Sequence, residues 1–459
     1  MAELRLALDT VIFAAGAGKL PSAPLGIVIV GIVLLAISVP IARRMGRTEG
    51  DPRLTTLLII GLLLHFLASP AQIFVDNHAY HGVADFSGYV HQGATLSANF
   101  RAFHFTTAGA GLRSALGDGS VSIAAGIVFA LVGVNELATF WVFAWFSWLG
   151  AIFFYQAFCI TFPEGEHRRY ALILFLLPSL LFWTSDVSKE AIMMLALGIT
   201  SLGAARALAR RRRGYPLIAI GTAMGIFTRP NEYALLLGAF TIAMFFRPSV
   251  ATGRPRAFRR LGTLVFLTAI LAVTAVFTVK FIHSNSGTVS TLIGSGKGKK
   301  ANTSSATVAA GLGSSNVPYS KDPLLYPRDI YTVLFDPLPI TARSITQLLA
   351  SGENTVILVL VLTSLRRLRS VYRAGRERPY VLLCAVYTLG FIYAFAALGN
   401  LGLITRERTL LFPYLLVLLA IPVSPKGQPP AFSWEKPRQT RRERRLEAAR
   451  AGLYPTRAP

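Results

Sequence analysis

The sequence predicts an all-α, polytopic integral membrane protein with about eleven transmembrane helices and further helices in its extracytoplasmic loops. Apolar residues make up 53% of the chain and charged residues only 15%, and the mean hydropathy is +0.52, which suits a bilayer better than water. The formal net charge is +24, but the basic residues fall in short clusters between apolar runs. This pattern indicates membrane topology and disfavours a nucleic-acid-binding surface, so we expect membrane lipids and no nucleic acid as partners.

Apolar runs along the chain define the expected spans. Residues 25–42 and 54–75 form the first two, and the positive-inside rule places the basic turn between them in the cytoplasm. Residues 121–134 are apolar but form a short run, so we interpret them as re-entrant or interfacial. The remaining expected spans are 137–160, 170–183, 191–208, 217–227, 233–246, 261–282, 355–365, 380–398 and 410–422.

The basic clusters are consistent with this number of spans. Residues 210–213, 247–260 and 366–378 and the tail from Lys426 are strongly basic, and all fall on the cytoplasmic side with this topology. A full crossing by residues 121–134 would invert every later segment. We therefore expect a multi-pass plasma-membrane domain over residues 1–424, with outer loops at 76–120 and 283–352. A basic, disordered cytoplasmic tail over residues 425–459 should follow it.

Four polar stretches lie on the extracytoplasmic face of this topology, at residues 76–93, 185–190, 228–232 and 400–408. They contain cations that the positive-inside rule disfavours there. Fixed cations beside carboxylates suit a ligand with a phosphate group, because arginine offers a planar fork and lysine a point charge. A single cation of this kind can equally reach lipid headgroups from a helix end. Taken together, they favour ligand binding by Lys189, Glu190, Arg229, Arg406 and Arg408.

Acid and base side chains are concentrated in the first of these stretches. Asp85, Tyr89 and Gly93 are spaced to share one face of a short helix. Asp85 could act as a general base on a sugar hydroxyl or hold a divalent metal ion, and we expect Tyr89 and His91 to contact substrate. Asp76 fits a helix cap as well as a catalytic acid. The histidines show no zinc-ligand spacing, so we assign no metal ligand.

Several short motifs resemble those of polytopic bacterial glycosyltransferases of the GT-C superfamily. They are Pro-Ser-(x)3-Trp-(x)5-Lys-Glu at residues 178–190 and Thr-Arg-Pro at 228–230. With Asp-Pro-Leu-Pro at 336–339 and Asn-Leu-Gly-(x)3-Arg-Glu-Arg at 400–408, they resemble membrane proteins associated with surface-polysaccharide synthesis more closely. The resemblance implies an inverting transferase that takes sugar from a polyprenyl-phosphate carrier. It also implies a loop acid as base, with Asp85 first and Asp76 second, although the superfamily often has these acids adjacent.

These observations favour transfer of a sugar from a polyprenyl-phosphate-linked donor to a glycan or lipid-linked acceptor, outside the cell, in cell-envelope polysaccharide synthesis. One alternative is an O-antigen-type polymerase of lipid-linked repeat units, which would depend more on the arginines than on an acid. A transporter or flippase would carry charged groups near the bilayer midplane and paired broken helices, which the sequence does not clearly show. A non-catalytic scaffold would not need four polar stretches on one face.

Overall fold

The computed structural model describes residues 24–79, 85–107, 110–112, 115–163, 167–248, 326–342, 345–396 and 401–422, and the isolated positions 268, 272 and 276. Every regular element in these residues is a helix, which confirms the all-α prediction. Contacts divide the chain into Met1–Ile421 and Pro422–Pro459. The expected span 261–282, the outer-loop segment 283–325 and the tail 425–459 lie outside the described residues, apart from those isolated positions.

Four described helices are long and apolar enough to cross a membrane: α2 (Pro24–Glu49), α3 (Pro52–Ala79), α6 (Glu136–Thr161) and α9 (Lys189–Leu208). They coincide with four of the expected spans, whereas the total of about eleven stays a prediction. The most apolar window of α9 is 83% buried within the protein, and that of α2 only 28%. The centre of the helix bundle is therefore formed by α9, while α2 presents an apolar face of the kind that contacts lipid, with Val28, Ile29, Ile32 and Val33 exposed.

The other described helices are shorter, and several begin at a proline. Pro178, Pro230 and Pro379 occupy the first turns of α8 (Pro178–Phe182), α11 (Pro230–Phe245) and α19 (Pro379–Phe395), where the missing N–H costs nothing. The remaining helices are α4 (Asp85–Arg101), α5 (Asp118–Val132), α7 (His167–Leu176), α10 (Gly214–Thr228), α15 (Tyr326–Phe335), α16 (Ile345–Thr363), α17 (Leu365–Arg369), α18 (Val371–Glu377), α20 (Leu401–Glu407), η2 (Arg408–Leu410) and α21 (Phe412–Leu419).

Two sequence-based boundaries differ from the structure. The expected span 170–183 is divided into α7 and α8, because Pro178 follows the extended residue Leu177 and cannot donate to the preceding turn. The sequence predicts that the second outer loop extends to residue 352 and that a separate span begins at residue 355. Instead, α16 begins at Ile345 and continues without a break through the apolar run to Thr363.

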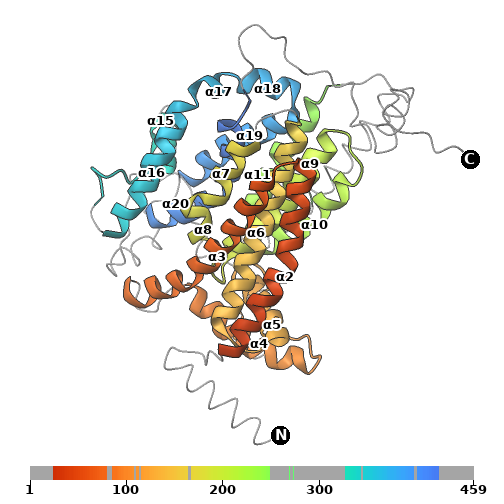
Figure 1. Ribbon diagram of the computed structural model, residues 1–459, viewed down its shortest axis with the longest axis vertical. Helices are drawn as coiled ribbons and strands as arrows, with labels where there is room; N and C mark the ends of the chain where they lie inside the picture. The colour runs from red at the N-terminus through yellow and green to blue at the C-terminus, as the bar shows by residue number, and fades with distance from the viewer. Residues whose placement is uncertain are drawn as a thin grey trace, which may run out of the picture. The chain divides into compact units, whose positions relative to one another are not determined.

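Close helix packing holds the centre of the bundle together. Figure 1 shows α2, α3, α6, α9 and α10 in the same bundle, and α9 packs extensively against both α6 and α10. A Cβ on Gly150 of α6 would overlap the backbone of Met194, and one on Gly198 of α9 would overlap Gly150 itself. Glycine at this crossing lets the two backbones approach, which is how helices gain van der Waals contact in lipid.

A second, smaller core positions α4 and α5 at one end of the bundle (Figure 1). Phe86 on α4 and Phe129 on α5 belong to the same buried cluster as Phe140 of α6 and Val187, just before α9. Gly93 of α4 packs directly against Ala125 of α5. This core brings the first turn of α4 close to the first turn of α9, where polar side chains collect.

Candidate functional site

The centre of the site is Glu190, the second residue of α9, whose side chain is fully buried. Arg229 donates to one of its carboxylate oxygens over 2.6 Å and Arg406 to the other over 2.8 Å. Ser188 caps the helix by accepting a hydrogen bond from the N–H of Ala191. A helix N-terminus favours a negative charge, and two charge-assisted hydrogen bonds compensate its burial.

Arg229 forms the inner, buried part of the site. It lies between α10 and α11 with a non-helical backbone, because the residue before Pro230 is kept out of the helical region. Besides Glu190, its guanidinium pairs with Glu232 at 2.7 Å and with Glu407. Arg229 thus links the start of α9, the start of α11 and the end of α20 through carboxylates that are themselves buried.

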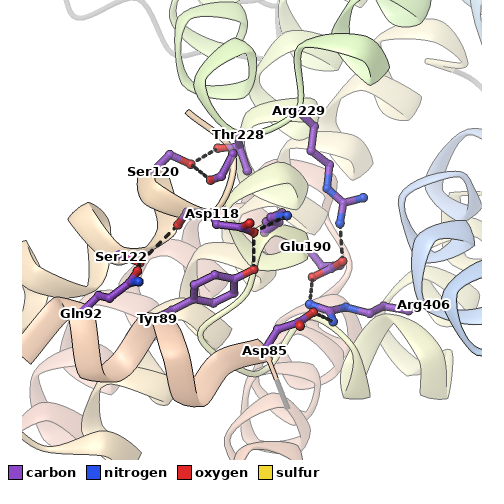
Figure 2. Close-up of polar contacts among 12 residues, drawn as sticks. Asp85, Tyr89, Gln92, Asp118, Ser120, Ser122, Glu190, Thr228, Arg229 and Arg406 are labelled. Carbon is purple, nitrogen blue, oxygen red and sulfur yellow. Dashed lines mark hydrogen bonds and ion pairs between the residues drawn. The ribbon is translucent and has the colours of Figure 1, made fainter. Parts of the chain in front are cut away.

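The outer part of the site is open to solvent. Arg406 donates to Asp85 over 2.7 Å, and the Asp85 side chain is 62% exposed. Lys189 lies 2.5 Å from Asp118, whose side chain is 63% exposed. Figure 2 shows Asp85 and Arg406 next to Glu190, and the Tyr89 hydroxyl pointing toward Asp118, to which it donates over 2.6 Å. Exposed pairs of this kind contribute at most about 1 kcal/mol, so a ligand anion can displace either acid from its cation.

Hydrogen bonds fix the α4–α5 pair beside this site. The Ser120 hydroxyl lies 3.2 Å from the Thr228 hydroxyl (Figure 2). The N–H of Gly117 donates to the carbonyl of Phe227 over 2.8 Å. Both contacts attach the start of α5 to the end of α10, next to Arg229. These contacts hold the chain on both sides of Asp118, while its carboxylate stays exposed.

Titration within the outer part follows from burial and charge. Burial, reinforced by the carboxylates of Asp118 and Asp85, raises the pKa of Tyr89, which stays a protonated donor at neutral pH. Burial also opposes ionisation of Asp118. The neighbouring Lys189 ammonium and the Tyr89 hydroxyl outweigh it and lower the pKa of Asp118 below its ordinary value.

Asp186 is a candidate that the sequence interpretation did not assign. It lies between α8 and α9, it is 6% exposed, and its Oδ1 has no hydrogen-bond partner within the described part of the chain. Burial raises the pKa of Asp186 to about 7, although the charge of Arg406 opposes the rise. Its position in the polar stretch 185–190 was the only sequence signal. A carboxyl group that titrates near neutral pH suits acid–base chemistry.

The structure brings most of the predicted site residues together, but not all of them. Asp76 is buried near the end of α3, and His91 is exposed on α4. Arg408 is fully buried elsewhere: it donates to Asn354 and to backbone carbonyls at the end of α15 and just beyond it. The residues that meet around Glu190 are Asp85, Tyr89, Lys189, Arg229 and Arg406, joined by Asp118, Glu232 and Glu407.

The chain matches no protein-family model, no curated protein and no solved structure. The resemblance to GT-C glycosyltransferases therefore stays a prediction. A divalent metal ion at Asp85 also stays a prediction. In this structure the partner of the Asp85 carboxylate is the guanidinium of Arg406. In the structure, two cations, Arg406 and Lys189, pair with exposed carboxylates that an anion could replace. Asp186, whose pKa is raised to about 7, lies within the electrostatic reach of Arg406.

Proposed function

We propose that this chain is a membrane glycosyltransferase. It moves a sugar from a polyprenyl-phosphate-linked donor to a glycan or lipid-linked acceptor, in cell-envelope polysaccharide synthesis. The proposal includes about eleven spans and an extracytoplasmic location for the site around Glu190. The observation that carries it is the division of this ion-pair cluster into a buried part and an exposed, exchangeable part.

The exchangeable part supports a phosphate-bearing donor. Arg406 is held in position by the buried Glu190, and its other terminal nitrogen contacts the exposed Asp85. A donor phosphate can take the place of Asp85 on that nitrogen and of Asp118 on Lys189. Arg229, enclosed by carboxylates, acts as a positioning residue that keeps Glu190 and therefore Arg406 in place.

The same displacement supports an acid–base role. When a phosphate binds Arg406, the carboxylate of Asp85 is released beside the donor and becomes able to accept a proton. We propose that Asp85 takes the proton of the acceptor hydroxyl, whose oxygen attacks the anomeric carbon. The bond from that carbon to the phosphate oxygen breaks, and the polyprenyl phosphate leaves with the electron pair, which inverts the configuration. Asp186 is the second candidate for this role, because it lies in the same region and its Oδ1 has no hydrogen-bond partner among the described residues.

A polymerase of lipid-linked repeat units is the alternative that one observation favours. The groups of the site with buried partners are Arg229 and Arg406, whereas Asp85 is exposed and could serve as a counter-ion alone. A polymerase would use these arginines to hold two carrier phosphates. It would then tolerate loss of either acid far better than loss of Arg406.

Deletion of the gene, followed by mass spectrometry of the accumulated lipid-linked glycans, tests the proposal. A transferase predicts an accumulated lipid-linked glycan that lacks one sugar, and a copy of the intact gene should restore the complete glycan. Accumulation of complete single repeat units without longer chains would replace the transferase with a polymerase. An unchanged lipid-linked pool would contradict both functions. A copy that carries Ser87→Cys, an exposed position on α4, is the matched control and should restore the pool fully.

A further inference from the structure

A second group of chemically reactive side chains lies at the other end of α6 from the site around Glu190. Glu49 is the last residue of α2, Cys159 lies in the last turn of α6, and His167 begins α7. Gly26 at the start of α2 packs against Asn135, which caps the start of α6, so the two helices run in the same direction. Their C-terminal ends therefore meet at this group.

The ligand atoms of these three residues face one another. The carboxylate of Glu49, the Sγ of Cys159 and a ring nitrogen of His167 all lie within 4.8 Å of one another. The Nδ1 of His167 is 3.0 Å from Oε2 of Glu49. All three side chains are at least partly withdrawn from solvent, since Cys159 is buried and the other two are 14% and 16% exposed. Such a group is either a charged histidine with a counter-ion or the ligand set of a metal ion.

The second ring nitrogen of His167 is fixed by the backbone. Its Nε2 lies 2.6 Å from the carbonyl oxygen of Phe162, which can only accept, so Nε2 carries the proton. The lone pair of Nδ1 then faces the carboxylate of Glu49, and these two acceptors need a shared cation: a second proton between them or a metal ion bound to both. Metal-binding histidines in proteins almost always donate their other N–H to a carbonyl or carboxylate in this way, which fixes the ring for coordination.

We propose that Glu49, Cys159 and His167 bind a Zn²⁺ ion. Thiolate, imidazole and carboxylate are the ligands that Zn²⁺ accepts, and a set of three leaves one tetrahedral position for water. Binding would displace the proton of the Cys159 thiol and any proton on Nδ1 into solvent. The ion would tie the ends of α2 and α6 to the start of α7, at the end of the bundle away from α4 and α5. This inference is independent of the proposed glycosyl transfer.

Metal binding by the purified full-length protein in detergent tests the proposal. Co²⁺ serves as the probe for the thiolate, because a cysteine bound to Co²⁺ gives an intense near-ultraviolet charge-transfer band. We expect that band on titration of the intact chain, and its loss when Zn²⁺ is added. Cys159→Ser should abolish the band, whereas Cys384→Ser should keep it, since Cys384 is the other buried free cysteine and lies on α19.

His167→Asn supplies a second variant in case Cys159→Ser does not fold. Loss of a group that only orients a metal ligand typically weakens metal affinity by roughly 10–100-fold. Because His167 would be a ligand itself, His167→Asn should weaken Zn²⁺ binding by more than that. Circular dichroism should show the same helix content as the intact chain. A band that is absent from the intact chain, or that disappears in Cys384→Ser and survives in Cys159→Ser, would overturn the proposal and leave a charged histidine paired with Glu49.

Discussion

The guanidinium of Arg406 lies 2.8 Å from the buried carboxylate of Glu190, although the two residues are 216 positions apart in the sequence. The same guanidinium reaches the exposed Asp85 over 2.7 Å. Arg406 thus forms one ion pair with a carboxylate that is buried and another with a carboxylate that solvent screens. The two pairs should contribute very differently to stability and to ligand binding.

Glu190→Gln should destabilise the protein much more than Asp85→Asn. Removing the buried charge leaves two guanidiniums without their shared partner, and breaking a buried pair of this kind costs about 3 kcal/mol or more. Asp85→Asn removes only an exposed pair and should cost less than about 1 kcal/mol. Thermal or denaturant unfolding in detergent, followed by circular dichroism, measures both. Equal stability of the two variants would contradict the division into buried and exposed parts.

The sequence predicted the helices and the polar stretches, but not how the stretches pair. Lys189 and Glu190 were identified because polar residues adjoin an apolar run, and Asp85 and Tyr89 because of their helical spacing. Helical periodicity carries no information about contacts between distant helices. For the same reason, it could not separate Arg406, which enters the site, from Arg408, whose side chain lies against the end of α15.

Most of the residues that sequence reasoning missed lie inside the polar stretches that it singled out. Glu232 and Glu407 each fall within a predicted polar stretch, yet the structure alone shows that both pair with Arg229. Asp186 became a candidate only through its burial, which no local pattern reveals. Asp118 begins α5, whose apolar run was interpreted as re-entrant or interfacial without a role in the site. Its place beside Lys189 depends on the tertiary packing of α4 and α5 against the bundle.

Asp186 should make the free energy of unfolding decrease as the pH rises from about 4 to about 7. Its pKa is raised from 3.8 to about 7 in the folded chain, so the folded state keeps a proton that the unfolded state releases. The stabilising contribution is therefore complete below pH 3.8 and lost as the pH passes through about 7. Asp186→Asn should flatten the dependence of unfolding free energy on pH across this interval. An identical slope in the variant and the intact chain would show that Asp186 is not the titrating group.

Ser87 should be accessible from outside the cell and Arg212 should not. Ser87 lies on α4 and Arg212 in the turn between α9 and α10, and both side chains are exposed. Whether either position reacts in intact cells therefore depends on the side of the membrane, not on burial within the protein. Ser87→Cys should react with an impermeant thiol reagent in intact cells, whereas Arg212→Cys should react only after lysis. The native cysteines are both buried and give a low background. The reverse labelling pattern would place the site around Glu190 in the cytoplasm.

Arg406→Lys should weaken donor binding even though it keeps the charge. A lysine cannot contact Glu190 and a donor phosphate at the same time with the planar fork of arginine. Loss of one charge-assisted hydrogen bond costs about 1.5–3 kcal/mol, or roughly 10–100-fold in donor affinity. Equilibrium binding of a fluorescent polyprenyl-phosphate analogue measures the change. Arg408→Lys is the matched control, and unchanged donor affinity there would agree with its burial away from Glu190.

Asp85→Asn should abolish most of the turnover while leaving donor affinity nearly unchanged. The amide keeps the shape of the carboxylate but cannot take a proton, and a positioned general base typically contributes about 10²–10⁴-fold. Turnover of the purified protein reconstituted with a lipid-linked donor measures the loss, and Asp76→Asn should show a milder one. If Asp186→Asn shows the large loss and Asp85→Asn does not, the buried acid is the base. Near-normal turnover in all three variants, with a large loss in Arg406→Lys, would instead favour the polymerase, because only the phosphate-binding cation would then be indispensable.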